Sequence, residues 1–183
     1  KSIKPEIRII LGGPEVSHSP DLPKVCELAD YVIAGPGEQD FRELCEKLLR
    51  HENPQTNYID GRATPLEQLI LPYRFYNDED IRNRLIYVEA SRGCPFKCEF
   101  CLSSLDKTAT AFPLDAFLVE IDQLWQRGVR NFKFIDRTFN LKITTSIAIL
   151  EFFLQRMSDD LYLHFEVVPD NLPDKLKSVL QKF

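Results

Sequence analysis

The sequence predicts an α/β fold built around parallel sheets, because short apolar runs alternate with amphipathic segments along most of its 183 residues. Gly and Pro close several of the apolar runs, which is typical of strands that are buried on both faces. The alternation stops between residues 51 and 84, where Pro, Gly and charged residues break both the strand and the helix periodicity of apolar residues. We therefore predict two sets of βα units, in residues 1–50 and 85–183, with residues 51–84 as an irregular linker.

The first set contains two predicted strands and two predicted helices. The strands are IRIIL (7–11), which ends at two glycines and a proline, and YVIA (31–34), which ends at Gly-Pro-Gly. The helices are LPKVCELA (22–29), with a proline near its start, and EQDFRELCEKLLR (38–50). The apolar residues of the second helix share one face, and we expect them to be buried: Phe41, Leu44, Cys45, Leu48 and Leu49. Cys26 and Cys45 are interpreted as small buried hydrophobes.

The second set contains three strands that alternate with three helices. The strands are predicted at LIYVEA (85–90), NFKFID (131–136) and LYLHFEVV (161–168). The helices are LDAFLVEIDQLWQR (114–127), ITTSIAILEFFLQRM (143–157) and PDKLKSVLQKF (173–183). Gly128 follows the first of them as a left-handed cap. Because neither set closes a sheet, we expect the chain to be a fragment of a longer protein.

Composition narrows the class of protein. No apolar run approaches the roughly 20 residues that a membrane span needs, and the N-terminus lacks the basic segment followed by an apolar segment that is typical of a signal peptide. We therefore predict a cytoplasmic protein. The net charge of -5 is spread along the chain without a stripe of Lys and Arg, so nucleic acid is not a predicted partner.

The densest chemical signal is SRGCPFKCEFC (91–101), which holds three of the five cysteines: Cys94, Cys98 and Cys101. Clustered thiols in a cytosolic protein predict a metal site rather than disulfides. Structural zinc needs four ligands, and the second cysteine pair is missing; His164 is remote in sequence and is interpreted as a core or edge residue. A four-iron cluster on three cysteines leaves one iron open for a small molecule. The loop also follows a predicted strand, at the end where α/β folds build active sites.

Cys94-x-x-x-Cys98-x-x-Cys101, with the aromatic Phe100 before the last cysteine, resembles the signature of the radical S-adenosylmethionine enzymes. The resemblance implies a TIM-barrel-like βα domain, of which this chain would hold the first three units, and a 4Fe–4S cluster whose open iron binds the amino and carboxylate groups of S-adenosylmethionine. Cleavage by one electron then yields a 5'-deoxyadenosyl radical. A small-molecule substrate and an electron donor are the implied partners.

The resemblance extends to both sides of the cysteines. GGPEVS (12–17) and ADYVIAGPGEQDF (29–41) resemble the second half of the Rossmann-like cobalamin-binding domain that precedes such barrels. SRGCPFKCEFCLSS (91–104) and KFIDRTFN (133–140) resemble the radical domain of magnesium-protoporphyrin IX monomethyl ester oxidative cyclase-like proteins. Cobalamin is thus an implied cofactor of the full-length protein. The Asp-x-His-x-x-Gly motif, whose histidine can ligate cobalt, has no counterpart in this sequence. His18 lies in HSPDLP, which does not match the motif.

Several residues are candidates for contacts to these cofactors. Phe100 would shield the cluster or stack on its ligand, and carboxylates at the ends of two strands, Asp136 and Glu166, would contact S-adenosylmethionine. The other interpretation is that Asp136 pairs with Arg137 or caps the next turn and that Glu166 is solvated. Thr138 and Asn140 are weaker candidates of the same loop. Four glycines follow the first two strands, either as a ligand cradle or as simple tight turns: Gly12, Gly13, Gly35 and Gly37.

Three alternatives remain open from the sequence. A methylthiotransferase-like radical enzyme acting on RNA would use the same loop but should bring additional cysteines and a basic surface. A zinc-binding, non-catalytic module would need a fourth ligand. An electron-transfer protein would close all four iron positions with cysteine.

Overall fold

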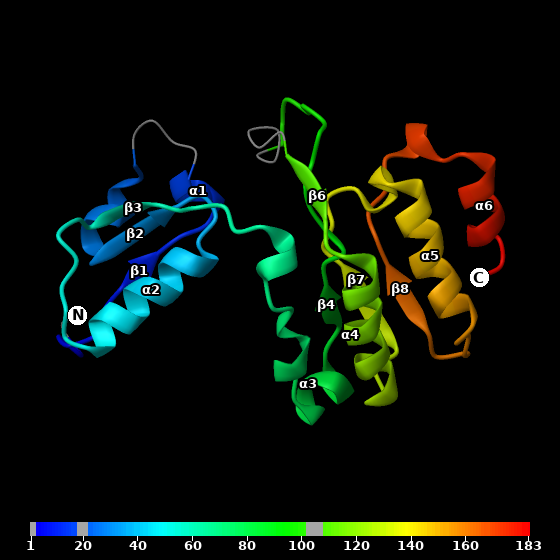
Figure 1. The fold of residues 1–183 in the computed structure, drawn as a ribbon, viewed down its shortest axis with the longest axis horizontal. Coiled ribbons are helices and arrows are strands. Elements are labelled where there is room, and N and C mark those ends of the chain that lie inside the picture. Colours follow the sequence, from blue (N-terminus) through cyan, green and yellow to red (C-terminus); the bar gives the residue numbers. More distant parts are fainter. Residues whose placement is uncertain (1–2, 18–21, 102–107) are drawn as a thin grey trace. The chain divides into compact units, whose positions relative to one another are not determined.

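The structure is a computed structural model that describes residues 3–17, 22–101 and 108–183 (Figure 1). The chain divides into two compact units, Lys1–Gln68 and Leu69–Phe183. Each unit has a parallel sheet of three strands, which confirms the α/β class with parallel sheets. None of the helices in the described residues is long and apolar enough to cross a bilayer.

The first unit is built on the sheet β1-β2-β3. Its strands are β1 (Ile10–Leu11), β2 (Tyr31–Ala34) and β3 (Tyr58–Asp60). All four residues of the central strand β2 are buried, as expected for a strand that is apolar on both faces. The strand predicted at 7–11 is shorter and less buried than expected. In the structure β1 is an edge strand of two residues, and both are half-buried.

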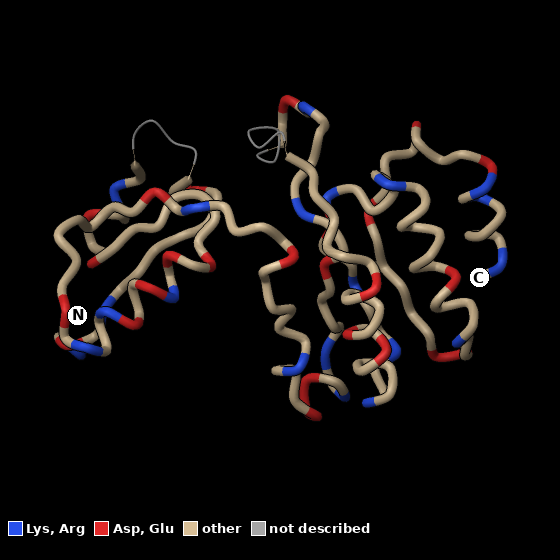
Figure 2. The backbone as a smooth tube through the Cα atoms, viewed as in Figure 1, with Lys and Arg blue, Asp and Glu red and all other residues tan. Residues whose placement is uncertain are grey.

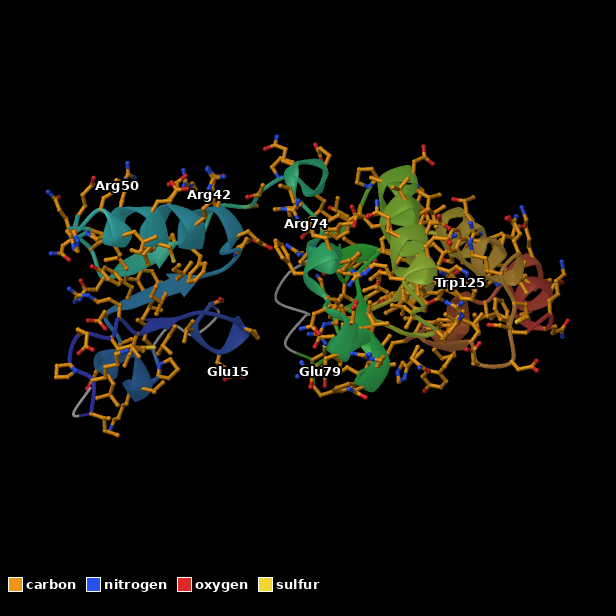
Figure 3. The ribbon with its side chains drawn as sticks, turned by 90° about the horizontal axis from the view of Figure 1, so that it is seen from below. Glu15, Arg42, Arg50, Arg74, Glu79 and Trp125 are labelled. Atoms are coloured by element: carbon orange, nitrogen blue, oxygen red, sulfur yellow. The ribbon has the colours of Figure 1, made fainter. Side chains whose placement is uncertain are left out.

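The helix α2 (Glu38–Leu49) packs on this sheet through Leu44 and Leu48. The expected apolar face is only partly right, because Leu49 is 81% exposed and Phe41 is 50% exposed. On the solvent side Arg42 pairs with Glu46 at 2.8 Å (Figure 3).

A buried carboxylate fixes α2 to the end of β3, which the apolar pattern does not indicate. Both oxygens of Asp40 accept hydrogen bonds from Arg62, from the backbone N–H at 2.7 Å and from Nε at 2.9 Å. Burial alone would raise the pKa of Asp40, but the hydrogen bonds and charge of Arg62 outweigh it and hold the pKa below its ordinary value. The stability from this pair is therefore present above the ordinary pKa and is lost as the pH falls through the depressed value.

The segment before β2 was predicted as a helix over 22–29, and this is wrong. It forms a short 3₁₀ helix, η1 (Lys24–Leu28), in which Val25 and Leu28 are exposed. The other helical turn of this region is α1 (Pro14–Ser17), directly after the first glycine pair. Cys26 and Cys45 are both half-buried, so the interpretation of each as a buried hydrophobe is corrected.

Residues 51–84, expected to be irregular, contain regular elements. These are β3, the 3₁₀ turns η2 (Leu66–Gln68) and η3 (Pro72–Phe75), and α3 (Asp78–Asn83). The helix α3 begins with a capping box between Asn77 and Asp80. The side chain of Tyr73, from η3, belongs to the core of the second unit.

The second unit is built on the sheet β4-β7-β8, with α4, α5 and α6 following the strands in turn (Figure 1). The strands are β4 (Ile86–Val88), β7 (Asn131–Phe134) and β8 (Tyr162–His164), and the helices are α4 (Leu114–Gln126), α5 (Ile143–Leu154) and α6 (Asp174–Leu180). The predicted order of three βα units is confirmed, and the barrel-like closure stays a prediction. Gly128 has a φ of 95°, as expected for a left-handed cap.

Aromatic side chains dominate the core of this unit. Phe132 and Phe134 of β7 contact Phe153 of α5, with ring centroids 5.0 and 6.3 Å apart. On α4 the side chains of Phe117 and Ile121 are buried in the same core. Trp125 of the same helix is half-buried and lies 3.7 Å from the guanidinium of Arg130 (Figure 3).

Between β4 and α4 the chain forms a small antiparallel ribbon that the sequence did not predict. It pairs β5 (Ser91–Gly93) with β6 (Ala109–Ala111). The three predicted ligands, Cys94, Cys98 and Cys101, lie in the loop that this ribbon encloses, and we call this the cysteine loop.

Candidate functional site

The base of the cysteine loop is held closed by the ribbon. Gly93 pairs with Ala109 at the end of the ribbon that adjoins the cysteine loop, and Gly93 has a φ of 89°. A side chain there has no room, because a Cβ on Gly93 would lie 1.8 Å from the carbonyl oxygen of Thr108. Glycine is therefore required at Gly93 both for its conformation and for the close approach of the two chain segments.

The three cysteines differ in exposure. Cys94, next to the ribbon, is buried, Cys101 is half-buried and Cys98 is exposed. A turn joins the last two, since the Cys101 N–H donates to the carbonyl of Cys98 at 3.0 Å. Within the described ranges no three side chains of His, Cys, Asp or Glu are gathered closely enough to hold a metal ion. The ligand role of the three cysteines stays a prediction, and their soft thiols fit an iron–sulfur cluster in chemistry.

Asp136 fixes the start of the ribbon. Its carboxylate is 2% exposed and accepts hydrogen bonds from the Ala90 N–H at 3.0 Å and from the Ser91 hydroxyl at 2.6 Å. Burial raises the pKa of Asp136, although the hydrogen bonds from Ser91 and Ala90 oppose the shift. Asp136 thus joins β7 to the β4–β5 junction, which neither of the two interpretations from the sequence anticipated.

Thr138 lies directly behind the first cysteine. Its hydroxyl oxygen is 3.6 Å from the sulfur of Cys94, and both side chains are buried. The short 3₁₀ turn η5 (Phe139–Leu141) follows. The sequence indicated Thr138 only as a weak ligand candidate, whereas the structure brings it into contact with a predicted cluster ligand.

Asn140 has a structural role. It is fully buried, and its amide donates to the carbonyls of Val168 at 2.8 Å and Asn171 at 2.6 Å. Its side-chain oxygen accepts from the Val168 N–H at 2.9 Å. These bonds fasten η5 to the segment after β8, so the amide is occupied by backbone partners.

Replacing Asn140 with aspartate is expected to lower the free energy of unfolding by about 3 kcal/mol, because a carboxylate oxygen would face two carbonyl oxygens in a buried site. Urea unfolding of the chain measures the change. Asn131→Asp is the matched control, since Asn131 is exposed and should change stability by less than about 0.5 kcal/mol. Equal effects of the two variants would contradict the structural role.

Two predicted ligand contacts lie at the surface. Phe100 is 94% exposed, so its shielding role stays a prediction. Glu166 lies beyond the end of β8, which is shorter than predicted, and its side chain is exposed. The Glu166 carbonyl accepts from the Phe139 N–H at 2.8 Å. The interpretation of Glu166 as a solvated residue fits this exposure, while a contact to S-adenosylmethionine stays a prediction.

A cavity of about 200 Å³ lies beside the cysteine loop. The ribbon contributes Ser91, Ala109 and Ala111 to its wall, and Asp136 lies next to them. The opposite wall comes from η5 and α5: Phe139, Leu141, Lys142, Thr145 and Ile149. The cavity therefore places a mixed wall, with apolar side chains beside Lys142 and Thr145, opposite a buried carboxylate at the end of the strands.

In the first unit a groove of about 490 Å³ collects the four predicted glycines, Gly12, Gly13, Gly35 and Gly37. Gly13 and Gly35 have positive φ values of 98° and 77°. Ser17 bridges them, because its hydroxyl donates to the Gly13 carbonyl and accepts from the Gly35 N–H, both at 2.7 Å. Phe41 lines the same groove, which explains its exposure on α2. The two glycine turns thus form one surface.

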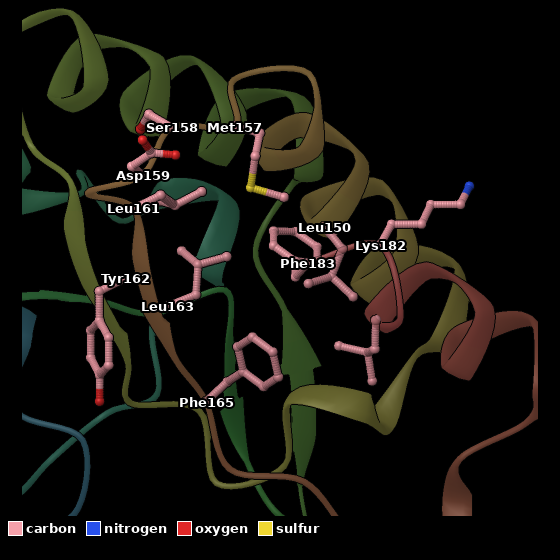
Figure 4. A pocket seen from close by; sticks show the side chains of 11 residues that line it. Leu150, Met157, Ser158, Asp159, Leu161, Tyr162, Leu163, Phe165, Lys182 and Phe183 are labelled. Carbon is pink, nitrogen blue, oxygen red and sulfur yellow. The ribbon is translucent and has the colours of Figure 1, made fainter.

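A larger hollow of about 560 Å³ follows β8 and the last turn of the chain (Figure 4). Met157, Tyr162, Phe165 and Phe183 are among the side chains that line it. None of the predicted site residues contributes to this hollow. His18, which does not match the cobalt-ligating motif, lies outside the described residues.

No protein-family model matches the sequence. An uncharacterised methyltransferase of Pyrococcus horikoshii, PH0819, is 28% identical over 173 residues, which cover 81% of this chain and 37% of that protein. A tRNA-2-methylthio-N(6)-dimethylallyladenosine synthase of Psychrobacter is 25% identical over 142 residues, covering 76% of this chain and 29% of that protein. The chain thus spans less than half the length of these curated relatives.

Solved structures extend the likeness to the fold. The radical S-adenosylmethionine methyltransferase TsrM of Kitasatospora setae, with cobalamin and a 4Fe–4S cluster bound, matches with a TM-score of 0.69 at 17% identity, covering 97% of this chain and 40% of TsrM. Its structure with tryptophan and an S-adenosylmethionine analogue matches with a TM-score of 0.66 and 94% coverage of this chain. The narrower likeness to the magnesium-protoporphyrin cyclases stays a prediction. The chain therefore shares its fold with TsrM.

Proposed function

We propose that this chain carries the cluster-binding and S-adenosylmethionine-binding part of a radical S-adenosylmethionine enzyme. The observation that carries the proposal is the cysteine loop, with its three-cysteine spacing, at the carboxyl end of β4 in a fold shared with TsrM. Active sites of parallel α/β folds are built at this end of the strands.

The proposed ligands are Cys94, Cys98 and Cys101, and their soft thiolates suit a 4Fe–4S cluster. When bound, the cluster would supply one electron for cleavage of S-adenosylmethionine at its open iron. The protein's part is to hold the three sulfurs and to exclude water. The ribbon closes the loop, buried Cys94 anchors it, and gathering the remaining thiols would accompany cluster insertion.

The cavity beside the loop is the proposed place of S-adenosylmethionine. It borders Ser91 at the start of the ribbon, and its other wall combines apolar side chains with Lys142 and Thr145. Because both oxygens of Asp136 already accept hydrogen bonds from the protein, we assign it first to positioning the ribbon and second to contact with the ligand. Phe100 and Glu166 would reach this ligand only by moving from their exposed positions.

The glycine groove of the first unit is the proposed cobalamin surface of the full-length protein. Glycine turns at the ends of parallel strands allow a large ligand to approach the backbone closely. The names of PH0819 and TsrM, both methyltransferases, favour methyl transfer as the reaction of the whole protein.

The second candidate is a methylthiotransferase acting on RNA, which the Psychrobacter relative favours. Acidic and basic side chains are interspersed along both units (Figure 2). Because RNA binding depends on gathered positive charge, we prefer a small-molecule substrate.

The test is anaerobic reconstitution with iron and sulfide, followed by electron paramagnetic resonance of the reduced chain with and without S-adenosylmethionine. We expect a four-iron signal that changes when S-adenosylmethionine is added and that is lost in Cys98→Ala. The matched control is Cys26→Ala, which removes a half-buried cysteine outside the loop and should leave the signal intact. A cluster signal that does not change when S-adenosylmethionine is added would refute the assignment as a radical S-adenosylmethionine enzyme. Retention of the signal in Cys98→Ala would refute the assignment of Cys98 as a cluster ligand.

A further inference from the structure

The segment after β7 reaches the cysteine loop through Thr138. The hydroxyl oxygen of Thr138 lies 3.6 Å from the sulfur of Cys94, within hydrogen-bonding distance for sulfur. Thr138 is 3% exposed and Cys94 is buried, so bulk water does not separate or screen this contact. In the proposed function Cys94 is a cluster ligand, and Thr138 would stand directly behind it.

The position of Thr138 is determined by its surroundings. The next residue, Phe139, donates its N–H to the Glu166 carbonyl at 2.8 Å, and its own carbonyl accepts from the Ser146 hydroxyl at 2.8 Å. Asn140 fastens the same turn to Val168. The hydroxyl of Thr138 is therefore carried by a backbone segment that is itself fixed, and the side chain is buried beside Cys94.

The chemistry gives this contact a direction. A hydroxyl and a thiol can each act as donor, but a ligating cysteine is a thiolate without a proton. When Cys94 holds a cluster, the Thr138 hydroxyl must be the donor. A hydrogen bond to a cluster sulfur stabilises the more negative, reduced state and so raises the reduction potential.

We propose that Thr138 is a positioning residue that donates a hydrogen bond to the Cys94 sulfur and thereby raises the reduction potential of the cluster. This inference rests on the proposed function, because it requires Cys94 to be a ligand. It assigns Thr138 to the cluster rather than to S-adenosylmethionine. Only the electron that reduces the cluster is involved, and a chemical reductant supplies it in the test.

The test is an anaerobic redox titration of the reconstituted full chain, followed by electron paramagnetic resonance, for wild type, Thr138→Val and Thr138→Ser. Valine has nearly the same shape but no hydroxyl, and serine restores the hydroxyl. We expect the equilibrium constant for reduction to fall roughly tenfold in Thr138→Val, which is about 59 mV toward negative potential for a one-electron couple. Thr138→Ser should stay close to wild type. Thr144→Val, at an exposed position on α5, is the matched control.

The outcomes separate this inference from the proposed function. Wild type without a four-iron cluster would overturn both. A cluster in wild type with the same potential in Thr138→Val would overturn the inference alone. Loss of the cluster in both the valine and serine variants would also overturn it, because the role would then be steric. Loss in valine alone, with retention in serine, would support the hydroxyl as the group that holds Cys94 in place.

Discussion

Replacing Gly93 with alanine is expected to open the base of the cysteine loop and to abolish cluster retention. The new Cβ would lie 1.8 Å from the Thr108 carbonyl oxygen, a distance that no packing tolerates, so the pairing of Gly93 with Ala109 must break. The positive φ of Gly93 adds a conformational cost of about 1–2 kcal/mol. We expect iron bound after anaerobic reconstitution to fall to the level of Cys98→Ala.

Gly128→Ala is the matched control for this prediction. Gly128 also has a positive φ, of 95°, but apart from Gly128 itself and its two chain neighbours no heavy atom of the described residues lies within 4 Å of a Cβ built there. Alanine at Gly128 therefore carries only the conformational cost, and the loop should still load its cluster. Iron content and urea unfolding of both variants check the difference. If Gly93→Ala binds as much iron as Gly128→Ala, cluster retention by the cysteine loop does not depend on the pairing of the ribbon.

The fold was predictable where the strands carry a clear burial pattern. YVIA in β2 is a continuous apolar run with all four residues buried, whereas NFKF in β7 alternates polar residues with the buried Phe132 and Phe134, and both are central strands. Strand β3 was missed because it has three residues, of which Tyr58 and Asp60 are exposed, so it has no apolar pattern. The predicted helix over 22–29 failed for the opposite reason: its apolar residues have helical spacing, but Val25 and Leu28 face solvent.

The candidate site was predictable only where its residues are neighbours in sequence. The cysteine spacing within 91–101 is visible directly, and its resemblance to the radical S-adenosylmethionine signature predicts a cluster. The ribbon was not visible in the sequence, since Ser-Arg-Gly and Ala-Thr-Ala have no strand pattern. The contact of Asp136 with Ser91 joins residues 45 positions apart, and no periodicity specifies which oxygen meets which donor.

Replacing Asp136 with alanine is expected to lower the free energy of unfolding by about 2 kcal/mol or more and to weaken cluster retention. The substitution removes the acceptor for the Ala90 N–H and the Ser91 hydroxyl, and a buried donor without a partner carries a desolvation cost. Both donors belong to the β4–β5 junction, so the start of the ribbon loses its attachment to β7. Urea unfolding and iron content after reconstitution measure the two effects.

Asp136→Asn is the matched control and adds a test by pH. The amide can accept from Ala90 and donate to Ser91, so at neutral pH its cost should be smaller than that of alanine, about 1 kcal/mol or less. Burial raises the pKa of Asp136 above its ordinary value of 3.8. The folded state therefore holds the proton more tightly than the unfolded state, and ionised Asp136 costs stability at pH values above the raised pKa.

The sign of the pH effect follows from this shift. As the pH falls through the raised pKa toward about 4, wild type regains the stability that ionisation removed, whereas the asparagine variant has no such group. The difference in unfolding free energy should therefore move in favour of wild type on acidification. A difference that is constant with pH, or that moves toward the variant, would show that burial does not dominate the environment of Asp136. The hydrogen bonds from Ser91 and Ala90 would then outweigh burial and hold the carboxylate ionised against the ribbon.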